Sequence, residues 1–333
     1  MIPLREHGWQ SQPWQWHLSH AVRDSETLLT ALRLPSSSVD TPFPVLVPWP
    51  YLAAMTPGDP DDPLLRQVLP LRDELDVVGG YVTDPLDEQT KAPIKGVLHK
   101  YEGRVLVITT AACAIHCRYC FRRHFPYDTF RINRSDWQDI VGYIRSKPDI
   151  REVILSGGDP LVANDQLLSW IAHQLASIDH VDTLRLHTRL PVVVPQRVCP
   201  ELVEWISKTS LKVVVVIHAN HANEMTQQVT DAAHRLTRAG ATLLNQSVLL
   251  KDVNDDADNL SDLSRRLFHA GVLPYYLHLL DPVTGTHHFE VPADDGRDLL
   301  TEMSRQLPGY LVPKLVRELP GAGAKESIPL NSK

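Results

Sequence analysis

Residues 105–120 read VLVITTAACAIHCRYC, which joins a run of mostly β-branched residues to three cysteines with the spacing CxxxCxxC. Cys113, Cys117 and Cys120 therefore lie on one short loop that directly follows an expected strand. Three thiolates at this spacing can hold three irons of a four-iron, four-sulfur (4Fe-4S) cluster, because cysteine sulfur ligates such clusters. The fourth iron is then left without a protein ligand, and chemistry can take place there.

A zinc site or a disulfide framework fits these cysteines less well. A structural zinc site needs four protein ligands, and the remaining cysteine, Cys199, is distant in the sequence. His116 lies between two of the cysteines, where chelation would be cramped. Four cysteines in 333 residues are too few for a disulfide framework. We interpret Cys199, which precedes Pro200 at an expected helix start, as an ordinary half-buried cysteine.

Composition favours a soluble, cytosolic protein with small-molecule ligands. The sequence opens with MIPLRE, which lacks the basic start and apolar stretch of a signal peptide, and no segment reaches the ~20 apolar residues of a membrane span. A reducing compartment suits thiolates that bind iron. The formal net charge of -7 argues against a nucleic acid as the direct partner.

Short apolar runs alternate with amphipathic stretches from residue 104 onward. Strands are expected at 105–110, 152–156, 183–187, 212–218, 242–250 and 273–280. Helices are expected at 135–145, 164–176, 201–208, 223–239 and 256–270. This alternation predicts a parallel α/β sheet, either doubly wound or curled into a barrel. In a barrel the active site lies at the C-terminal ends of the strands, where the cysteine loop would be.

The residues before 104 have a different character. Trp9, Trp14 and Trp16 are followed by a proline-rich, acidic stretch at 42–70. We expect a helical and irregular N-terminal region that packs on the α/β domain.

The cysteine loop resembles that of the radical S-adenosylmethionine (SAM) enzymes, and the residues around it resemble one branch, the lysine 2,3-aminomutase family. The similarity covers nearly the whole chain through the segments 55–63 (MTPGDPDDP), 109–110 (TT), 120–123 (CFRR), 156–161 (SGGDPL), 187–191 (HTRLP), 245–250 (NQSVLL) and 320–325 (PGAGAK). The resemblance implies an α/β fold, a partial (β/α) TIM-like barrel of the radical SAM type with an N-terminal helical extension. The expected division is 1–95 for the extension, 96–318 for the barrel and 319–333 for a glycine-rich loop.

The family reaction implied is conversion of (S)-α-lysine to (R)-β-lysine. Removing a hydrogen from an unactivated carbon is beyond acid–base chemistry near neutral pH, so such steps need a radical cofactor. The resemblance implies a 4Fe-4S cluster that cleaves SAM to a 5′-deoxyadenosyl radical, and lysine held as an imine on pyridoxal 5′-phosphate (PLP). Within the family, the sequence resembles the short form, which makes (R)-β-lysine for the modification of elongation factor P. Expected partners are free lysine, an electron donor such as flavodoxin or ferredoxin, and elongation factor P through a β-lysine ligase.

The PLP lysine is expected to be Lys325, which follows the glycine-containing run at 321–324. Considered alone, this segment favours a mobile linker with a solvated lysine, and its place in the family pattern reverses that interpretation. Lys100, Tyr101 and Arg104 match the family's phosphate-binding segment, although Lys100 stands where arginine is usual and lacks its bidentate fork. For Arg104 the alternative is a solvated strand end.

Substrate contacts are also implied by the resemblance. Arg122 matches the partner of the substrate carboxylate. Asp281 and Glu318 match the acids that receive the ε-ammonium, and Glu318 replaces the aspartate of the familiar free-lysine enzyme. Two acids at these positions favour lysine over glutamate as the substrate.

SAM is expected to be bound by residues near the strand ends, namely Arg118, Ser156, Gly157, Gly158, Asp159, His218 and Gln246. His218 and Gln246 could also be ordinary buried polar residues of the strands. Longer family members carry cysteines that bind zinc at a subunit contact. Here Asp256 stands at one of those positions and the chain ends at Lys333 without such cysteines, so we predict no zinc site, and the family's tetramer does not carry over.

The sequence leaves several other functions open. The chain could isomerise another amino acid or make a free β-amino acid. It could be a radical enzyme of another reaction type, such as a methyltransferase, or a non-catalytic iron-sulfur protein.

Overall fold

Nine strands form one sheet in which every neighbour in space is also a neighbour in sequence. The computed structural model describes residues 8–36, 39–130 and 132–330. The strands are β1 (Val97–Tyr101), β2 (Arg104–Thr110), β3 (Glu152–Gly157), β4 (Thr183–Thr188), β5 (Lys212–Ile217), β6 (Thr242–Val248), β7 (Leu273–His278), β8 (Lys314–Arg317) and β9 (Glu326–Ser327). The six expected strands are thus confirmed as β2 to β7.

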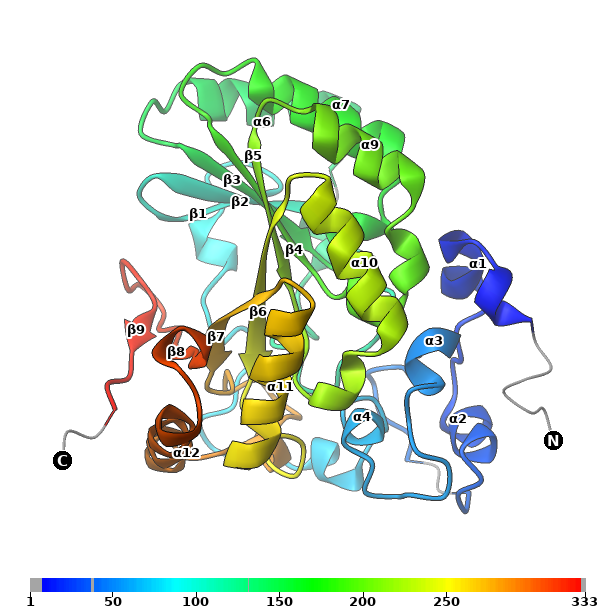
Figure 1. The fold of residues 1–333 in the computed structure, drawn as a ribbon. Helices are drawn as coiled ribbons and strands as arrows, with labels where there is room; N and C mark the ends of the chain where they lie inside the picture. Colours follow the sequence, from blue (N-terminus) through cyan, green and yellow to red (C-terminus); the bar gives the residue numbers. More distant parts are fainter. Residues whose placement is uncertain (1–7, 37–38, 131, 331–333) are drawn as a thin grey trace.

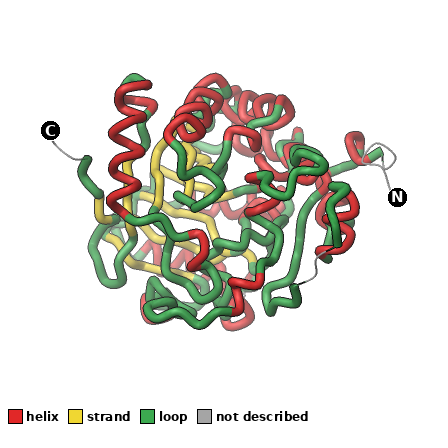
Figure 2. Tube along the Cα trace, turned by 90° about the horizontal axis from the view of Figure 1, so that it is seen from below, coloured by secondary structure: helices red, strands yellow, loops and turns green. Residues whose placement is uncertain are grey.

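Strands β2 to β8 pair in parallel, and β1 and β9 add antiparallel strands at the two edges. In the described residues no pairing joins the first strand to the last, so the barrel is open. Figures 1 and 2 show the strands in the interior, with helices along the outside. The expected partial (β/α) barrel is confirmed.

The longer helices are α6 (Arg134–Arg145), α7 (Asp165–Ala176), α9 (Pro200–Lys208), α10 (Gln227–Arg238), α11 (Ala257–His269) and α12 (Ala293–Gln306). Most begin at a polar side chain that accepts a hydrogen bond from the first turn: Asn133 for α6, Asn164 for α7, Thr226 for α10 and Asp256 for α11. The predicted start of the fourth helix at residue 223 is wrong, because Thr226 caps α10 and a separate turn precedes it.

Shorter helices occupy the N-terminal region and the loops. They are η1 (Trp9–Ser11), α1 (Trp14–Ser19), α2 (Ser25–Ala31), α3 (Trp49–Leu52), α4 (Pro63–Arg66), η2 (Arg72–Leu75), η3 (Gln89–Lys91), α5 (Tyr127–Phe130), η4 (Pro160–Val162), α8 (Leu190–Val193), η5 (Pro195–Arg197), η6 (Ala222–Glu224), η7 (His287–Phe289) and η8 (Gly309–Leu311).

The N-terminal region shares its core with the sheet. Trp14, Leu28 and Leu52 belong to the same buried hydrophobic cluster as Val107 on β2 and Val215 on β5. The N-terminal region and the barrel therefore bury apolar surface against each other, which is the largest favourable contribution to folding.

The two faces of the strands differ in exposure. Along β4, Leu184, Leu186 and Thr188 are buried, whereas Arg185 and His187 on the opposite face are part-exposed. β6 alternates in the same way. Because side chains alternate across a strand, one face is covered by helices and the other carries polar groups inside the open barrel.

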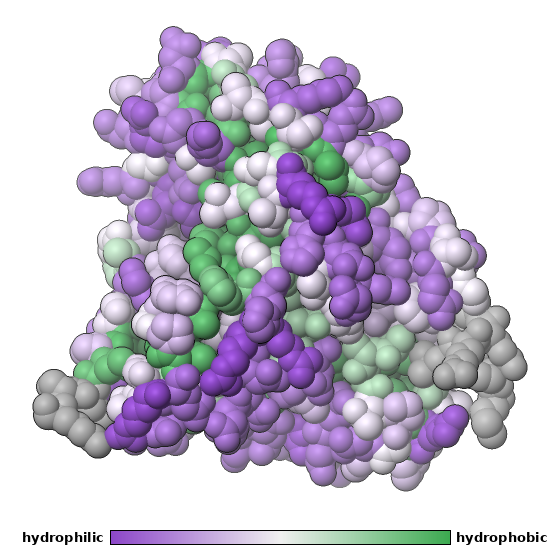
Figure 3. All heavy atoms as spheres, viewed as in Figure 1, coloured by the Kyte–Doolittle hydropathy of each residue, from purple (hydrophilic) through white to green (hydrophobic). Residues whose placement is uncertain are grey.

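The face of the molecule seen in Figure 3 is largely polar. Charged and polar residues cover most of the face in Figure 3, with hydrophobic residues between them. Within the described residues, no helix combines the length and apolar character needed to cross a bilayer.

Candidate active site

The cysteine loop follows β2 and is held by the backbone of residues 156–159, the SGGD segment at the end of β3. The amide of Gly158 donates to the Thr110 carbonyl at 2.7 Å, and that of Asp159 donates to the Ala112 carbonyl at 2.8 Å. A Cβ atom on Gly158 would overlap the backbone of Ala112. Glycine is therefore required here for close approach of two backbones, a role different from the predicted contact with SAM.

Cys113, Cys117 and Cys120 are free and part-exposed. Burial, together with neighbouring thiols, raises the pKa of Cys113, and burial with the nearby Cys117 raises the pKa of Cys120 to about 11. Thiols in such surroundings ionise when a metal replaces their protons. Nδ1 of His116 lies 2.9 Å from the Pro44 carbonyl, and its ring stacks on Phe43. The donor set thus fits a cluster held by the three cysteines.

Arg118, predicted to bind SAM, is fully buried with its guanidinium committed to the N-terminal region. Its Nε donates to Glu74 at 2.7 Å, and Nη1 donates to the Phe43 carbonyl at 2.8 Å. Nη2 contacts Glu74 and Thr41. A role at SAM would require these bonds to open, so the structure gives this prediction no support.

Arg122 is bound by Glu88, a residue to which no sequence motif pointed. Nε and Nη2 of Arg122 donate to the two carboxylate oxygens of Glu88 at 2.6 and 2.9 Å. Nη1 donates to Ser156 at 3.0 Å. Burial would raise the pKa of Glu88, but Arg122 and Lys100 hold that pKa below its usual value. The Nε and Nη2 side of the Arg122 guanidinium, which could have bound a substrate carboxylate through two hydrogen bonds, is therefore occupied by Glu88.

A chain of alternating charges continues from Glu88. Nζ of Lys100 lies 2.9 Å from Glu88 and 3.1 Å from Glu318, and Nζ of Lys325 lies 2.6 Å from Glu318. The hydroxyl of Tyr101 also donates to Glu318 at 3.1 Å. Although burial acts to raise the pKa of Glu318, the two lysines lower it, so this carboxylate is ionised. The structure thus brings together four predicted residues from two segments, of which Lys100 and Glu318 are 218 residues apart in sequence.

Asp281 lies within the electrostatic reach of this network. Burial and the negative charge of Glu318 raise its pKa to about 7, while Lys325 and Lys100 oppose the rise. Arg104 is next to the network, with its guanidinium 4.4 Å from the centre of the Tyr101 ring. The residues predicted to bind PLP and those predicted to bind the substrate ammonium therefore lie in one site.

Three histidines line the inner face of the sheet. Nε2 of His218 lies 2.9 Å from the side-chain amide nitrogen of Gln246, and its ring is 6.1 Å from that of His187. Burial and Arg189 lower the pKa of His218 to about 3, so the ring is neutral. Among the described residues, Nε2 of His187 and Nε2 of His278 are buried without a hydrogen-bond partner. Orphaned donors or acceptors of this kind fit a site that receives a polar ligand.

Asp159 is used within the protein. Its carboxylate accepts hydrogen bonds from the Thr188 hydroxyl at 2.7 Å and from the amides of Leu161, Arg189 and Leu190. Burial raises the pKa of Asp159, and these bonds lower it. Asp159 therefore fixes the turn after β4, and its predicted contact with SAM gains no support.

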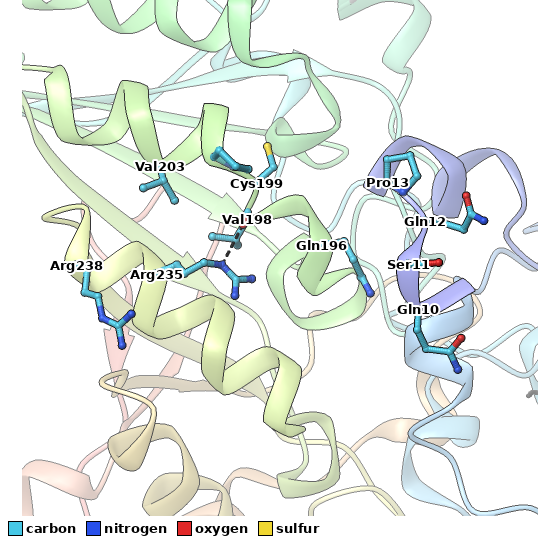
Figure 4. Close-up of a pocket in the computed structure, with 11 residues that line it drawn as sticks. Gln10, Ser11, Gln12, Pro13, Gln196, Val198, Cys199, Val203, Arg235 and Arg238 are labelled. Carbon is cyan, nitrogen blue, oxygen red and sulfur yellow. Dashed lines mark hydrogen bonds between the residues drawn. The ribbon is translucent and has the colours of Figure 1, made fainter. Parts of the chain in front are cut away.

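A cavity of about 680 Å³ lies elsewhere, and none of the predicted site residues lines it. Figure 4 shows it between the segment that includes Gln12 and the helices α9 and α10, with Cys199 and Arg235 among its lining residues. Cys199 immediately precedes α9, whose first residue is Pro200 as predicted. This cysteine is remote from the charge network.

Comparison with known proteins identifies the class of enzyme. The model of the radical SAM superfamily matches residues 107–263. The L-lysine 2,3-aminomutase of Escherichia coli is 45% identical over 326 residues, which cover 96% of this chain and 95% of that protein. The L-lysine 2,3-aminomutase of Clostridium subterminale is 36% identical over 96% of this chain and 78% of its own length. A solved radical SAM methyltransferase from Sphaerobacter thermophilus has a TM-score of 0.44 and 14% identity, covering 66% of this chain and 68% of that one.

The chain is therefore a radical SAM enzyme with an α/β fold. It belongs to the lysine 2,3-aminomutase family, whose members are isomerases that use a 4Fe-4S cluster, SAM and PLP. The described residues fit these cofactors through the three cysteines, the orphaned histidine nitrogens and the lysine network.

Proposed function

We propose that this protein converts L-α-lysine into (R)-β-lysine in the cytoplasm. The observation that carries the proposal is the joined network of Arg122, Glu88, Lys100, Glu318 and Lys325, with Asp281 beside it. Lysine has a carboxylate at one end and an ammonium at the other, and the network offers cations and acids at one site. Free glutamate would place a second anion against Glu318 and Asp281, and like charges in such surroundings repel.

We assign Cys113, Cys117 and Cys120 to the cluster and Lys325 to PLP. When bound, the cluster and SAM supply a 5′-deoxyadenosyl radical, and PLP supplies the conjugation that lets an amino group migrate. The protein's own task is to bind and orient: Lys100, Tyr101 and Arg104 provide donors for a phosphate, as Lys and Arg commonly do.

The remaining assignments concern the residues that bind the substrate and those that bind SAM. Glu318 and Asp281 receive the substrate ammonium, and Arg122 offers its remaining donors to the carboxylate. Ser156, Gly157, His218 and Gln246 face SAM from the strand ends, and the open barrel shields the reacting atoms from water. The division into residues 1–95, 96–318 and 319–333 remains our prediction of how the chain is organised.

The direct test is product analysis. Anaerobically prepared protein with a reconstituted cluster, SAM, PLP and dithionite should convert α-lysine into β-lysine, resolved by chiral chromatography. Isomerisation of another amino acid with lysine untouched would contradict the substrate assignment.

Cysteine variants test the cluster assignment. Cys113→Ala, Cys117→Ala and Cys120→Ala should each lose iron and release no 5′-deoxyadenosine, while Cys199→Ala keeps both. Normal release from Cys117→Ala would refute the assignment, and a cluster without any SAM cleavage in the parent would revive a non-catalytic iron-sulfur protein.

Lys325→Ala tests the PLP lysine. The near-visible absorbance of bound PLP should disappear, and borohydride should fail to attach a pyridoxyl label to the chain. Lys314→Ala is the matched control, because Lys314 lies exposed on β8 in the same region. A label mapped to Lys100 in the parent would contradict the assignment.

We further propose that the product serves elongation factor P, and that flavodoxin or ferredoxin supplies the electron. The support is that this chain is more similar in sequence to the Escherichia coli relative than to the Clostridium relative. The match covers nearly all of the Escherichia coli protein, whereas the Clostridium protein is longer. A coupled assay with a β-lysine ligase should add the product mass to elongation factor P. Accumulation of free β-lysine in cells without such transfer would favour the alternative, free β-amino acid production.

A further inference from the structure

Arg189 is a buried arginine in the turn after β4, and its guanidinium reaches the cysteine loop. Nη1 lies 2.6 Å from the sulfur of Cys117. Among the described residues, no other cysteine of the triplet has an arginine donor at its sulfur. This contact joins two segments that are 72 residues apart in sequence.

Nη2 of the same guanidinium is fixed from several directions, whereas Nε is buried without a hydrogen-bond partner among the described residues. Nη2 donates to Gln67 at 2.7 Å, to Glu224 at 2.9 Å and to the hydroxyl of Tyr51 at 3.1 Å. The guanidinium carbon also lies 5.3 Å from the centre of the Tyr51 ring and 5.6 Å from that of Tyr119. With so many partners holding Nη2, Nη1 has a defined direction, towards Cys117.

The backbone of Arg189 is equally constrained. Its amide donates to Asp159 at 2.7 Å, and the neighbouring residue of the SGGD segment, Gly158, is bonded to the residues just before the cysteine loop. Gly158 and Asp159 therefore fix the position of the cysteine loop and also that of Arg189, which contacts the loop.

The acid that pairs with Arg189, Glu224, contacts Nη2, whereas Nη1 lies at the sulfur of Cys117, so a positively charged nitrogen faces the sulfur directly. Glu224 is shared among several donors, because it also accepts from the amides of Asn220 and His221 and from Gln67. A cation near a cluster sulfur favours the reduced, more negative form of the cluster. Hydrogen bonds to the sulfurs and nearby charge are established determinants of cluster potential.

We propose that Arg189 is a positioning residue for the cluster: through its hydrogen bond to the sulfur of Cys117 it orients this ligand and raises the reduction potential of the cluster. The step concerned is a one-electron reduction, in which the external electron donor is oxidised and no proton moves. The inference rests on the cluster assignment made above.

A purely structural role would also account for a buried arginine here, because Arg189 joins the N-terminal region to the barrel. Arg197 provides a matched control. It is likewise a buried arginine, it pairs with Asp165 and stacks on Trp14, and it contacts the sulfur of Cys199, which lies outside the triplet.

The experiment compares Arg189→Gln, Arg189→Lys and Arg197→Lys in the full chain. Iron and sulfide content, unfolding temperature and the midpoint potential from an anaerobic titration followed by electron paramagnetic resonance are measured without SAM. The potential of Arg189→Gln should shift to a more negative value, that of Arg189→Lys should shift less, and that of Arg197→Lys should equal the parent value.

The outcomes separate this inference from the proposed function. If both Arg189 variants hold a full cluster with the same midpoint potential as the parent protein, the inference about Arg189 is wrong, while the proposed function is unaffected. Loss of iron from both, with unfolding temperatures like that of Arg197→Lys, would support the orienting role. If the parent protein holds no cluster, or if Cys117→Ala holds one normally, the cluster assignment itself fails.

Discussion

At the scale of single residues, Asp281 has a charge that changes near neutral pH. Its pKa is raised to about 7 by burial and by Glu318. In the role proposed for Asp281 the lysine ammonium binds the ionised carboxylate, so protons compete with the substrate. Well below the pKa the ionised fraction falls about tenfold per pH unit. We expect the KM for lysine to be lowest above pH 7 and to rise steeply as the pH falls below it.

Asp281→Asn is the control for this pH dependence. The variant should have a higher KM at pH 8 and should lose the rise below pH 7. A KM that stays flat from pH 6 to 8 in the parent would contradict the assignment.

The raised pKa of Asp281 also affects folding. The substrate-free folded protein binds this proton more tightly than the unfolded chain does, so the contribution of the protonated carboxyl to stability is lost as pH rises through about 7.

Glu88 is expected to position Arg122 for the substrate. Glu88→Gln removes a charge that two cations share, which leaves Arg122 and Lys100 less well fixed. We expect kcat/KM for lysine to fall by about one to two orders of magnitude, mainly through KM. Glu204→Gln is the control, since Glu204 is exposed. A lower KM in Glu88→Gln would show instead that Glu88 competes with the substrate carboxylate.

Site residues differ in how readily they can be predicted from the sequence. The cysteines can be singled out because their ligand spacing is local. Lys325 is indicated only by its place in the family pattern, since the glycine-containing run alone favours a solvated linker. Glu88 and Arg189 could not be predicted, since a buried ion pair or a bond to sulfur leaves no pattern when its partners are far apart in the chain. The pairing of Lys100 with Glu318 spans 218 residues. Arg189 lies within the HTRLP segment, but nothing in that segment indicates that it contacts Cys117.

At the scale of elements, strands β2 to β7 were predictable because their short apolar runs, rich in β-branched or aromatic residues, alternate with amphipathic helices, most of which have a side-chain cap. The edge strands β1 and β9 and the penultimate strand β8 were missed, since they are short and gain their partners from the completed sheet. Helix α12 was also missed. It contains Gly296 and several acids, which weaken a helical pattern, yet Gly296 packs closely against Leu249 and Leu315.

The contact between the SGGD segment and the cysteine loop leads to a prediction about a glycine. Gly158→Ala should push Ala112 away, lower the free energy of unfolding by about 1–3 kcal/mol and reduce iron content. Gly142→Ala on α6 is the control. A Cβ there meets nothing within 4 Å, so the helix should gain up to about 1 kcal/mol. Unchanged iron content in Gly158→Ala would contradict the proposed role of this contact.

At the scale of the whole molecule, Glu74 links the N-terminal region to the barrel. Its buried carboxylate pairs with Arg118 and Arg123, which flank the last cysteine of the triplet. Glu74→Gln leaves two buried cations without their acid, so we expect stability to fall by about 3–5 kcal/mol. Chemical denaturation under anaerobic conditions measures the loss.

Glu204→Gln again serves as the comparison, because Glu204 pairs with Lys208 on an exposed helix face. Its effect should stay within about 0.5 kcal/mol. Equal stability of the two variants would show that the pairs of Glu74 contribute little to the attachment. Composition predicted that the N-terminal region packs on the barrel, but the buried acid that holds it there had no sequence signature.

The sequential strand order has a consequence for synthesis on the ribosome. Because sheet neighbours are also chain neighbours, β2 to β5 and the cysteine loop can assemble while the rest of the chain is still being translated. Glu318 and Lys325 emerge last, and β9 joins the sheet after every other strand has formed. A nascent chain can thus complete the cysteine loop before Lys325, the proposed PLP lysine, has been made, so on the proposed assignments premature termination before Lys325 would leave a cluster site without a PLP site.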